Sequence, residues 1–558
     1  MKKLLPLLLV LASLQSKAQA PFHTKEFINA NNINALMAVH GDLWLDPDST
    51  RSVCEFPNFS GLNIGFSGSI WFGGYDVLNS LHVSGQMYRR GTTDYWPGPI
   101  DSIGHTVSYA TSSDWAKIWK VNRTDLNDFL SYAHHDTTNT PPSILTWPGK
   151  GNIYARGNAN VPLHITQDMA PFADLNGNGN YEPLEGEYPL FYGAQTLWTV
   201  FNDVGPTHSY SHGAPVGVEV KSTAFAFYRG SLIDNVVYYD YEITNKSVYN
   251  YHDFKIGLWE DLDIGYYGDD YLGFDSFWRM GFMYNGDYSD GRVAGYPITS
   301  YGDSTPIVGV TVIKAPGDSS TGPVPLGSCM SFTLDSAAIG YPIYDSDYYN
   351  TMQSRFRDGR HLRNDFRGRG IYASGFSPYG PETNYIFTGE IGDTTLWSEC
   401  NARNIIGERH FVLSTGSLSL NVGETKHILM ALVTTNVLPH NTCADLTSFN
   451  GIRTVADTAW RFYQSLPPLG VLHDGESSDL SFRLYPNPAG DAISLKTDFT
   501  RIADAEIQVF NSLGQQQNLE VTHQQGEVKI NTANLTIGSY FLRVTSKGFQ
   551  KTMVFEKQ

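Results

Sequence analysis

Short segments with alternating side chains, connected by turns, recur between residues 196 and 435 of this 558-residue chain. In the segment 236–243, Val, Tyr, Asp and Glu at even positions alternate with Val, Tyr, Tyr and Ile at odd positions. A period of two is typical of a β-strand, whose successive side chains point to opposite faces. Because no helical pattern separates these segments, they favour a β-sandwich over an α/β fold. The 13% aromatic content and the 53 glycines also suit half-buried strands and turns.

The strongest helical pattern lies at residues 446–466. Apolar side chains recur there at helical spacing, and Pro467 and Pro468 end the pattern. A polar segment rich in Pro and Gly follows, which is typical of a linker. We therefore predict a mainly β, multi-domain chain with few helices and these boundaries: a leader at 1–20, an irregular β region at 21–195, a β-sandwich-like region at 196–466, a linker at 467–480 and a small β-sandwich at 481–558.

The first twenty residues have the three parts of a secretory signal peptide. Lys2 and Lys3 provide the positive charge, residues 4–14 are apolar, and Ala-Gln-Ala at 18–20 forms a small-residue cleavage site. This apolar run is too short to cross a bilayer, and no later segment approaches the roughly 20 apolar residues that a spanning helix needs. The sequence therefore predicts an exported protein without a transmembrane segment.

The C-terminal segment, residues 482–558, reads as a run of short alternating strands. Val528 and Ile530 alternate with polar residues, and Tyr540, Leu542 and Val544 follow a turn at Gly538. Prolines cannot donate a hydrogen bond to a central ladder, so the YPNP sequence at 485–488 suits an edge strand. These features predict a small antiparallel sandwich.

Three motifs of this segment carry a resemblance to a known family. YPNP at 485–488, G-x-Y-x-L-x-V at 538–544 and Phe-x-Lys at 555–557 together resemble the type A C-terminal sorting domain of the type IX (Por) secretion system of Bacteroidetes. The resemblance implies an Ig-like β-sandwich, engagement with the type IX secretion machinery, and export through the periplasm to the outer cell surface or the medium. It also implies that the machinery removes this domain.

Parts of the preceding chain resemble a second group. SIWFGGYD, APFADLNGNGNYEPLEGEYPL and GLWEDLDIGYYGDDYLGFD are similar to segments of uncharacterised secreted proteins of Bacteroidetes that carry the same sorting domain. That resemblance implies an extracellular multi-domain β protein and no particular reaction. This chain has Asn rather than the more usual Asp at positions 176 and 178.

A candidate calcium loop spans residues 174–185. The pattern D-x-N-x-N-G followed by Glu fits a twelve-residue loop of oxygen ligands, and two glycines allow it to curl around the ion. Flanking prolines exclude the helices of an EF-hand, so a structural Ca²⁺ is predicted. The alternative is a loop of Asx turns without an ion. The predicted ligands are Asp174, Asn176, Asn178, Asn180, Glu182 and Glu185.

A second acidic segment spans residues 260–275. Its carboxylates repel one another unless water or a cation neutralises them, because each close pair costs about 1–4 kcal/mol. Three interpretations stay open: a second Ca²⁺ site, a solvated acidic loop, or a carboxylate pair for glycoside hydrolysis. The candidate ligands of this weaker site are Asp261, Asp263, Asp269, Asp270 and Asp275, with Glu260 beside them.

Composition and motifs narrow the function class. With 38 basic and 56 acidic residues, the chain lacks the excess of positive charge that nucleic-acid binding requires. The sequence contains no HExxH, GxSxG, phosphate-loop or dinucleotide motif, so no catalytic or cofactor-binding residue is assigned. The four cysteines, Cys54, Cys329, Cys400 and Cys443, allow one or two disulfides in an exported protein, in pairings that the sequence leaves open.

These observations support a functional hypothesis and a rival. The hypothesis is a secreted or surface-attached structural or adhesion-type β protein with structural calcium and a glycan or extracellular-matrix ligand. The rival is an extracellular hydrolase that acts on glycans or peptides.

Overall fold

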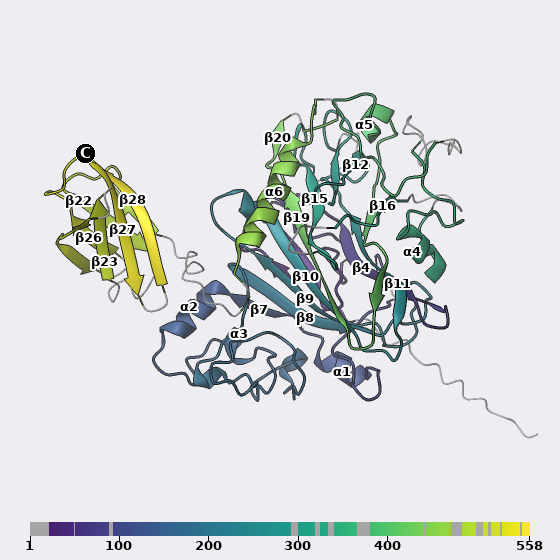
Figure 1. Ribbon diagram of the computed structural model, residues 1–558, viewed down its shortest axis with the longest axis horizontal. Helices are drawn as coiled ribbons and strands as arrows, with labels where there is room; N and C mark the ends of the chain where they lie inside the picture. Colours follow the sequence, from purple (N-terminus) through teal and green to yellow (C-terminus); the bar gives the residue numbers. More distant parts are fainter. Residues whose placement is uncertain are drawn as a thin grey trace, which may run out of the picture.

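The computed structural model describes residues 22–49, 51–88, 93–291, 300–318, 324–332, 340–364, 380–439, 441–443, 445–467, 469, 482–497, 506–511, 515–524, 527–546 and 549–558. The predicted signal peptide at 1–20 and most of the predicted linker at 467–480 lie outside these residues. Strands greatly outnumber helices, which confirms the mainly β fold class (Figure 1).

Two antiparallel sheets form the larger part of the molecule. The larger, nine-stranded sheet has the order β12 (Asp270–Asp275), β13 (Met280–Asn285), β15 (Val308–Lys314), β19 (Thr425–Thr434), β10 (Val236–Asn245), β9 (Val218–Ala226), β8 (Gln195–Asn202) and β6 (Trp96–Pro97), and β7 (Trp119–Asn122) also pairs with β8. The six-stranded sheet has the order β16 (Ser328–Ser331), β17 (Phe411–Ser414), β11 (Tyr251–Asp261), β4 (Ser67–Tyr75) and β5 (Leu81–Ser84), and β18 (Leu418–Leu420) also pairs with β11.

The period-two pattern of β10 explains how these sheets are layered. Val237, Tyr239 and Tyr241 face the largest apolar core, which also contains Ile256 and Leu258 of β11. The opposite face of β10 carries Val236 and Tyr238, which belong to a second core with the helix α6 (Asn450–Ser465). Each face of the strand is therefore buried against a different layer.

Helix α6 covers part of the outer face of the nine-stranded sheet, where Figure 1 shows it over β15 and β19. Ile452, Val455, Ala456 and Ala459 are buried, as the helical pattern predicts, and the Tyr238 hydroxyl donates a hydrogen bond to the Ala459 carbonyl at 2.8 Å. The helix begins at residue 450 rather than at the predicted 446. The N–H group of Phe449, the residue before the helix, donates a hydrogen bond to the Glu390 carboxylate at 2.8 Å.

Shorter elements complete this part of the chain. Strands on both sides of residue 195 share the sheets, since β4 pairs with β11 and β7 pairs with β8. The remaining elements are β1 (Lys25–Ile28), β2 (Asn34–Ala38), β3 (Cys54–Glu55), β14 (Ser304–Thr305), β20 (Leu438–Pro439), α1 (Tyr109–Asp114), α2 (Arg123–Ser131), α3 (Pro142–Leu145), α4 (Asp345–Thr351), α5 (Glu399–Ala402), η1 (Asn158–Asn160), η2 (Pro183–Glu185) and η3 (Leu232–Asn235).

The C-terminal segment forms its own small sandwich of two four-stranded sheets, drawn in yellow in Figure 1. Ile493, Leu495 and Val528 of one sheet meet Leu542 and Val544 of the other in a separate apolar core, as the alternation predicts. One sheet has the order β21 (Phe482–Tyr485), β22 (Ala492–Thr497), β26 (Glu527–Asn531) and β25 (Val521–Gln524), and the other β24 (Gln516–Gln517), β23 (Glu506–Asn511), β27 (Gly538–Ser546) and β28 (Phe549–Lys557).

The cysteines divide into one bridge and two buried thiols. Cys400 of α5 is bonded to Cys443, with 5.8 Å between their Cα atoms. Cys54 and Cys329 are free and buried, and burial raises the pKa of both thiols well above the usual value. Among the described residues, no helix is both long and apolar enough to span a bilayer.

Candidate functional site

The loop 174–185 is exposed at residues 174–178, buries Tyr181 and Pro183, and curls tightly through its own hydrogen bonds. The Asp174 carboxylate accepts hydrogen bonds from the N–H groups of Gly177 and Asn178 on one oxygen and of Gly179 on the other, at 2.8–3.2 Å. Gly177 and Gly179 have positive φ angles of 75° and 76°, as the curl requires. The loop therefore holds its shape by Asx turns.

The six predicted ligands of this loop are partly brought together. The Asn176 and Asn178 amides both donate to one oxygen of Glu182, at 2.9 Å and 2.6 Å, and the Asn180 N–H donates to Asn178. Glu185 follows in η2. Sequence reasoning missed Glu187, a fully buried carboxylate that accepts hydrogen bonds from the N–H groups of Leu175 and Glu182. Glu187 therefore joins the start of the loop at Leu175 to its later part at Glu182.

The carboxylates of the acidic segment 260–275 are buried rather than solvated, and they have different hydrogen-bond and ion-pair partners. Asp275, at the far end of β12, forms an ion pair with Arg453 of α6 at 2.6 Å. Asp270, at the start of β12, accepts a hydrogen bond from the Ile264 N–H, and Asp269 accepts one from the Gly291 N–H. In addition to burial, which is the main cause, the charge of Asp269 raises the pKa of Asp263, and the charges of Asp269 and Asp263 both raise that of Asp270, so these three carboxylates lie near one another while Asp275 is paired with Arg453.

Glu260 and Asp261 end strand β11 and point to opposite faces of its sheet. Glu260 lies in the core between the sheets, and a Cβ atom at Gly68 would lie 2.4 Å from its carboxylate. Burial raises the pKa of Glu260 well above its usual value. Asp261 lies on the other face, where residues distant in sequence approach it.

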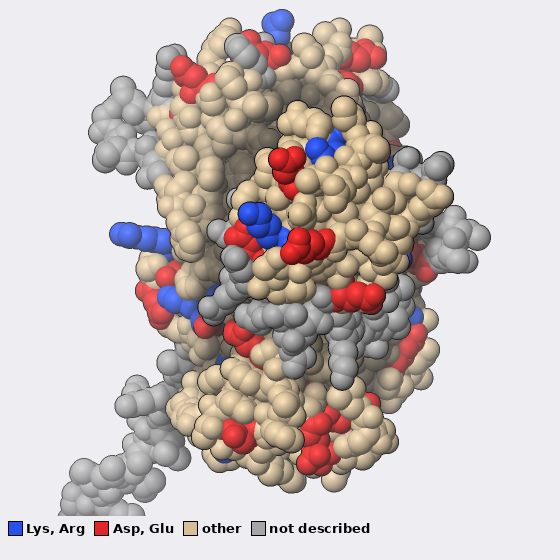
Figure 2. Space-filling view, turned by 90° about the vertical axis from the view of Figure 1, so that its left-hand side faces the viewer, with Lys and Arg blue, Asp and Glu red and all other residues tan. Residues whose placement is uncertain are grey.

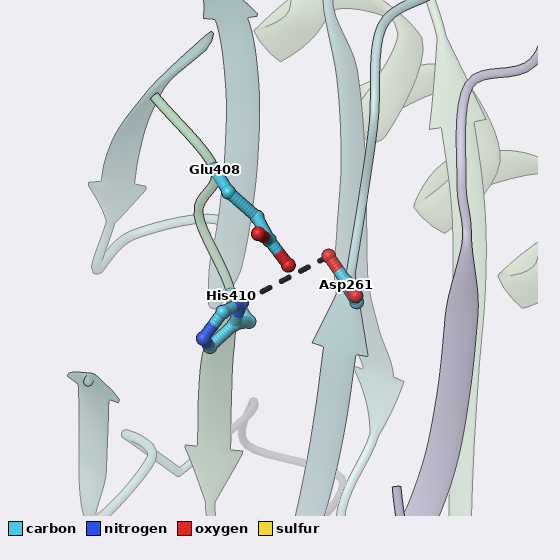
Figure 3. Close-up of side chains that lie close together, drawn as sticks. All are labelled: Asp261, Glu408 and His410. Carbon is cyan, nitrogen blue, oxygen red and sulfur yellow. Dashed lines mark ion pairs between the residues drawn. The ribbon is translucent and has the colours of Figure 1, made fainter. Parts of the chain in front are cut away.

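The pairing of β11 with β17 brings His410 and Glu408 to Asp261. Glu260 is paired with Phe411, so the next position of β11 faces His410, the residue before β17. Glu408 lies two residues earlier, on the same side of the extended chain. Figure 3 shows the three side chains together, with 3.9 Å between the Asp261 Oδ1 and His410 Nδ1 atoms. One ligand atom from each of the three residues lies within 4.8 Å of the other two.

Burial dominates the electrostatics of this cluster. It raises the pKa of Asp261 well above the usual value and that of Asp263 to about 8, with like charges as the second cause in both. Burial, with the nearby Arg409 charge, lowers the pKa of His410 to about 3. Without a cation, burial therefore favours the neutral forms of Asp261, Asp263 and His410.

The cluster lies beside a surface cleft of about 1320 Å³. Segments distant in sequence form the walls of this cleft. Its lining includes aromatic, acidic and histidine side chains, namely Tyr88, Tyr210, Tyr267, Tyr341, Asp263, Glu408 and His212. The Tyr88 hydroxyl donates to Asp261 Oδ2 at 2.7 Å and lies 3.2 Å from the Tyr341 hydroxyl. The cleft thus combines aromatic surfaces with carboxylates.

The charges on the outside of the protein are more dispersed. On the face shown in Figure 2, the basic side chains of the described residues stand singly among acidic ones. The formal net charge of the chain is −18 at neutral pH. The described residues of this face therefore form no concentrated positive surface for a polyanion.

Comparison with known proteins identifies one part of the chain. Residues 483–555 match the family described as the secretion system C-terminal sorting domain. No curated protein matches the chain. A solved structure of a polysaccharide lyase is similar over 61% of this chain and 34% of its own, with 8% identity and a TM-score of 0.16. The chain thus spans about a third of the length of that lyase.

The matched family and the fold of residues 482–558 agree with the motifs at 485–488 and 538–544. This sorting domain directs proteins of Bacteroidetes through the type IX secretion system. The chain is therefore a cargo protein of the type IX secretion system, exported to the cell surface or to the medium.

Proposed function

We propose that this protein is an adhesion-type extracellular binding protein whose cleft takes a glycan of a surface or an extracellular matrix. The observation that supports this function is the cleft of about 1320 Å³ with its tyrosines and carboxylates. Ligand sites are typically concave, with aromatic walls and a few polar groups that fix orientation. The C–H faces of a sugar ring pack against aromatic rings, and its hydroxyls donate hydrogen bonds to carboxylates.

The cleft has both rigid and accessible aromatic groups. Tyr88 and Tyr341 are held by their contact with each other, and the Tyr341 ring stacks on His410 with 4.9 Å between centroids. Tyr267 is 51% exposed and is therefore available to a ligand. Because the side chains of this wall are already fixed, a ligand loses less binding free energy to the ordering of side chains.

The export and calcium features complete this proposal. Residues 1–20 act as a signal peptide, and residues 467–480 link the cargo region to the sorting domain. A structural Ca²⁺ is bound by the loop 174–185, and the support for it is the ligand spacing of the loop together with its tight curl around the Asp174 carboxylate. Extracellular calcium is abundant enough for a weak site of this kind.

Hydrolysis of a glycan is a second candidate function, because Asp263 and Glu408 both line the cleft. Glycosidases place two carboxyl groups on either side of the scissile bond, about 5–10 Å apart. Under this alternative, the bound glycan would be cut and new reducing ends would appear.

Binding of the full chain to an array of glycans and matrix polysaccharides tests the proposed function. We expect binding without product release, and we expect Tyr267→Ala to weaken it about 3- to 10-fold, as the loss of one aromatic contact implies. Tyr288→Ala is the matched control, because Tyr288 is 72% exposed and lies outside the cleft lining.

Three results would count against this function. If no carbohydrate binds, or if the two tyrosine variants lose binding equally, the cleft is not the glycan site. Release of reducing ends that Asp263→Asn abolishes would favour the hydrolase instead.

A further inference from the structure

We propose that Asp261, Glu408 and His410 bind a divalent transition-metal cation of the zinc class at the wall of the cleft. Their ligand atoms already lie within 4.8 Å of one another. Carboxylate oxygens and imidazole nitrogens bind zinc at about 2.0–2.2 Å. The three donor atoms must therefore move toward one another by roughly 1 Å to share the ion. Figure 3 shows that the side chains approach one another from two neighbouring chain segments.

Three buried atoms in this cluster lack hydrogen-bond partners among the described residues. Asp261 Oδ1 and both ring nitrogens of His410 have none among the described residues, although each residue is only 1% exposed. A buried polar atom without a partner is costly, and such atoms are uncommon in folded proteins. A cation between the Asp261 oxygen and the His410 nitrogen would satisfy both, so the missing partners point independently to a ligand.

The surroundings of the cluster are those of a supported metal site. The Tyr88 hydroxyl holds the outer oxygen of Asp261 at 2.7 Å, which leaves the inner oxygen directed at His410. The rings of Tyr341 and Phe332 pack against the imidazole at 4.9 Å and 5.0 Å and fix its position. Contacts of this kind orient metal ligands in known sites.

The identity of the donors selects the class of metal. Calcium takes six to eight oxygen ligands, so an imidazole argues against it, whereas one nitrogen and two carboxylates suit zinc and related ions. Because Glu408 lines the cleft, the ion has a route from solvent. Three protein ligands leave a coordination position for water or for a polar group of a ligand in the cleft.

Zinc binding to the full chain, without a histidine tag and freed of metal beforehand, tests this inference. We expect isothermal titration with Zn²⁺ to find a site that Glu408→Gln weakens at least 10-fold, as the loss of one charged ligand implies. Glu55→Gln is the matched control, because Glu55 also lines the cleft and lies outside the cluster. His410→Gln provides a second variant, and its circular dichroism shows whether the fold is kept.

Co²⁺ provides a second readout, since its visible absorption changes when an imidazole becomes a ligand. We expect that absorption in the wild type and in Glu55→Gln, and its loss in a folded His410→Gln variant. Absence of Zn²⁺ binding by the wild type, or equal affinities of wild type and Glu408→Gln, would overturn the inference. These measurements contain no glycan, so their outcome is separate from that of the glycan-binding test.

Discussion

Replacement of Asp174 separates two roles that the structure gives to its carboxylate. The carboxylate accepts three backbone hydrogen bonds within the loop, from residues 177, 178 and 179. Loss of a comparable capping carboxylate costs about 0.5–2 kcal/mol whether or not an ion is present. If Asp174 is also a calcium ligand, Asp174→Ala additionally removes the stabilisation by calcium, about 2.7 kcal/mol at a hundredfold excess over the dissociation constant.

Urea unfolding of metal-free protein, with and without added CaCl₂, measures the two contributions. We expect calcium to raise the free energy of unfolding of the wild type by about 2–3 kcal/mol. Asp174→Ala should be less stable than the wild type without calcium and should gain almost nothing from it. Asp174→Asn keeps one acceptor oxygen and loses the charge, so it should retain most of the turn and only part of the calcium effect.

Asp136→Ala is the matched control for this experiment. Asp136 also accepts backbone hydrogen bonds in an exposed turn, from the N–H groups of Thr138 and Asn139, and it belongs to no predicted calcium site. This variant should lose some stability and keep the full response to calcium. If wild type and Asp174→Ala gain equally from calcium, or if neither gains, the loop is only a set of turns and the structural-calcium proposal is refuted.

Three further predictions concern pH, the disulfide and export. Burial raises the pKa of the Asp240 carboxyl group from 3.8 to about 6, although the charges of His427 and Lys314 act in the opposite direction. The contribution of this group to the free energy of unfolding is therefore greatest below about pH 4 and is lost as the pH rises through 6. We therefore expect the free energy of unfolding of Asp240→Asn, measured in urea relative to that of the wild type, to be about 1–3 kcal/mol higher at pH 7 than at pH 4.5. An equal difference between variant and wild type at both pH values would contradict this prediction. Replacement of Cys400 and Cys443 by serine should cost about 2–4 kcal/mol, because the bridge spans 43 residues and restricts the unfolded chain; an unchanged urea midpoint under oxidising conditions would refute that. Deletion of residues 482–558 should leave the protein in the periplasm, as cell fractionation would show, and normal export of the truncated chain would count against the role of the sorting domain.

The fold could be predicted largely from local patterns. The period of two at 236–243 gives both faces of β10, and the alternation around Leu542 gives the core of the sorting domain. The apolar pattern predicts a helix at 446–466, and the structure has α6 at Asn450–Ser465, with the Phe449 N–H before it bonded to the distant Glu390. Local periodicity is a strong signal because it reflects which side chains each strand or helix must bury.

The candidate site depends on pairing between distant segments, which no local pattern reveals. Glu408 and His410 reach Asp261 only because β17 pairs with β11 in one particular register. The same limit applies to Asp275, whose ion pair with Arg453 forms through the packing of α6 on the sheet. The acidic run at 260–275 did mark one side of the cleft, but its partners could be found only in the folded chain.

Anomalous diffraction at the zinc edge, from crystals of the full chain soaked with Zn²⁺, tests the cleft cluster most directly. The account predicts a peak within about 2.0–2.2 Å of donor atoms of Asp261, Glu408 and His410. Peaks at surface histidines or at the loop 174–185, with none at this cluster, would contradict it.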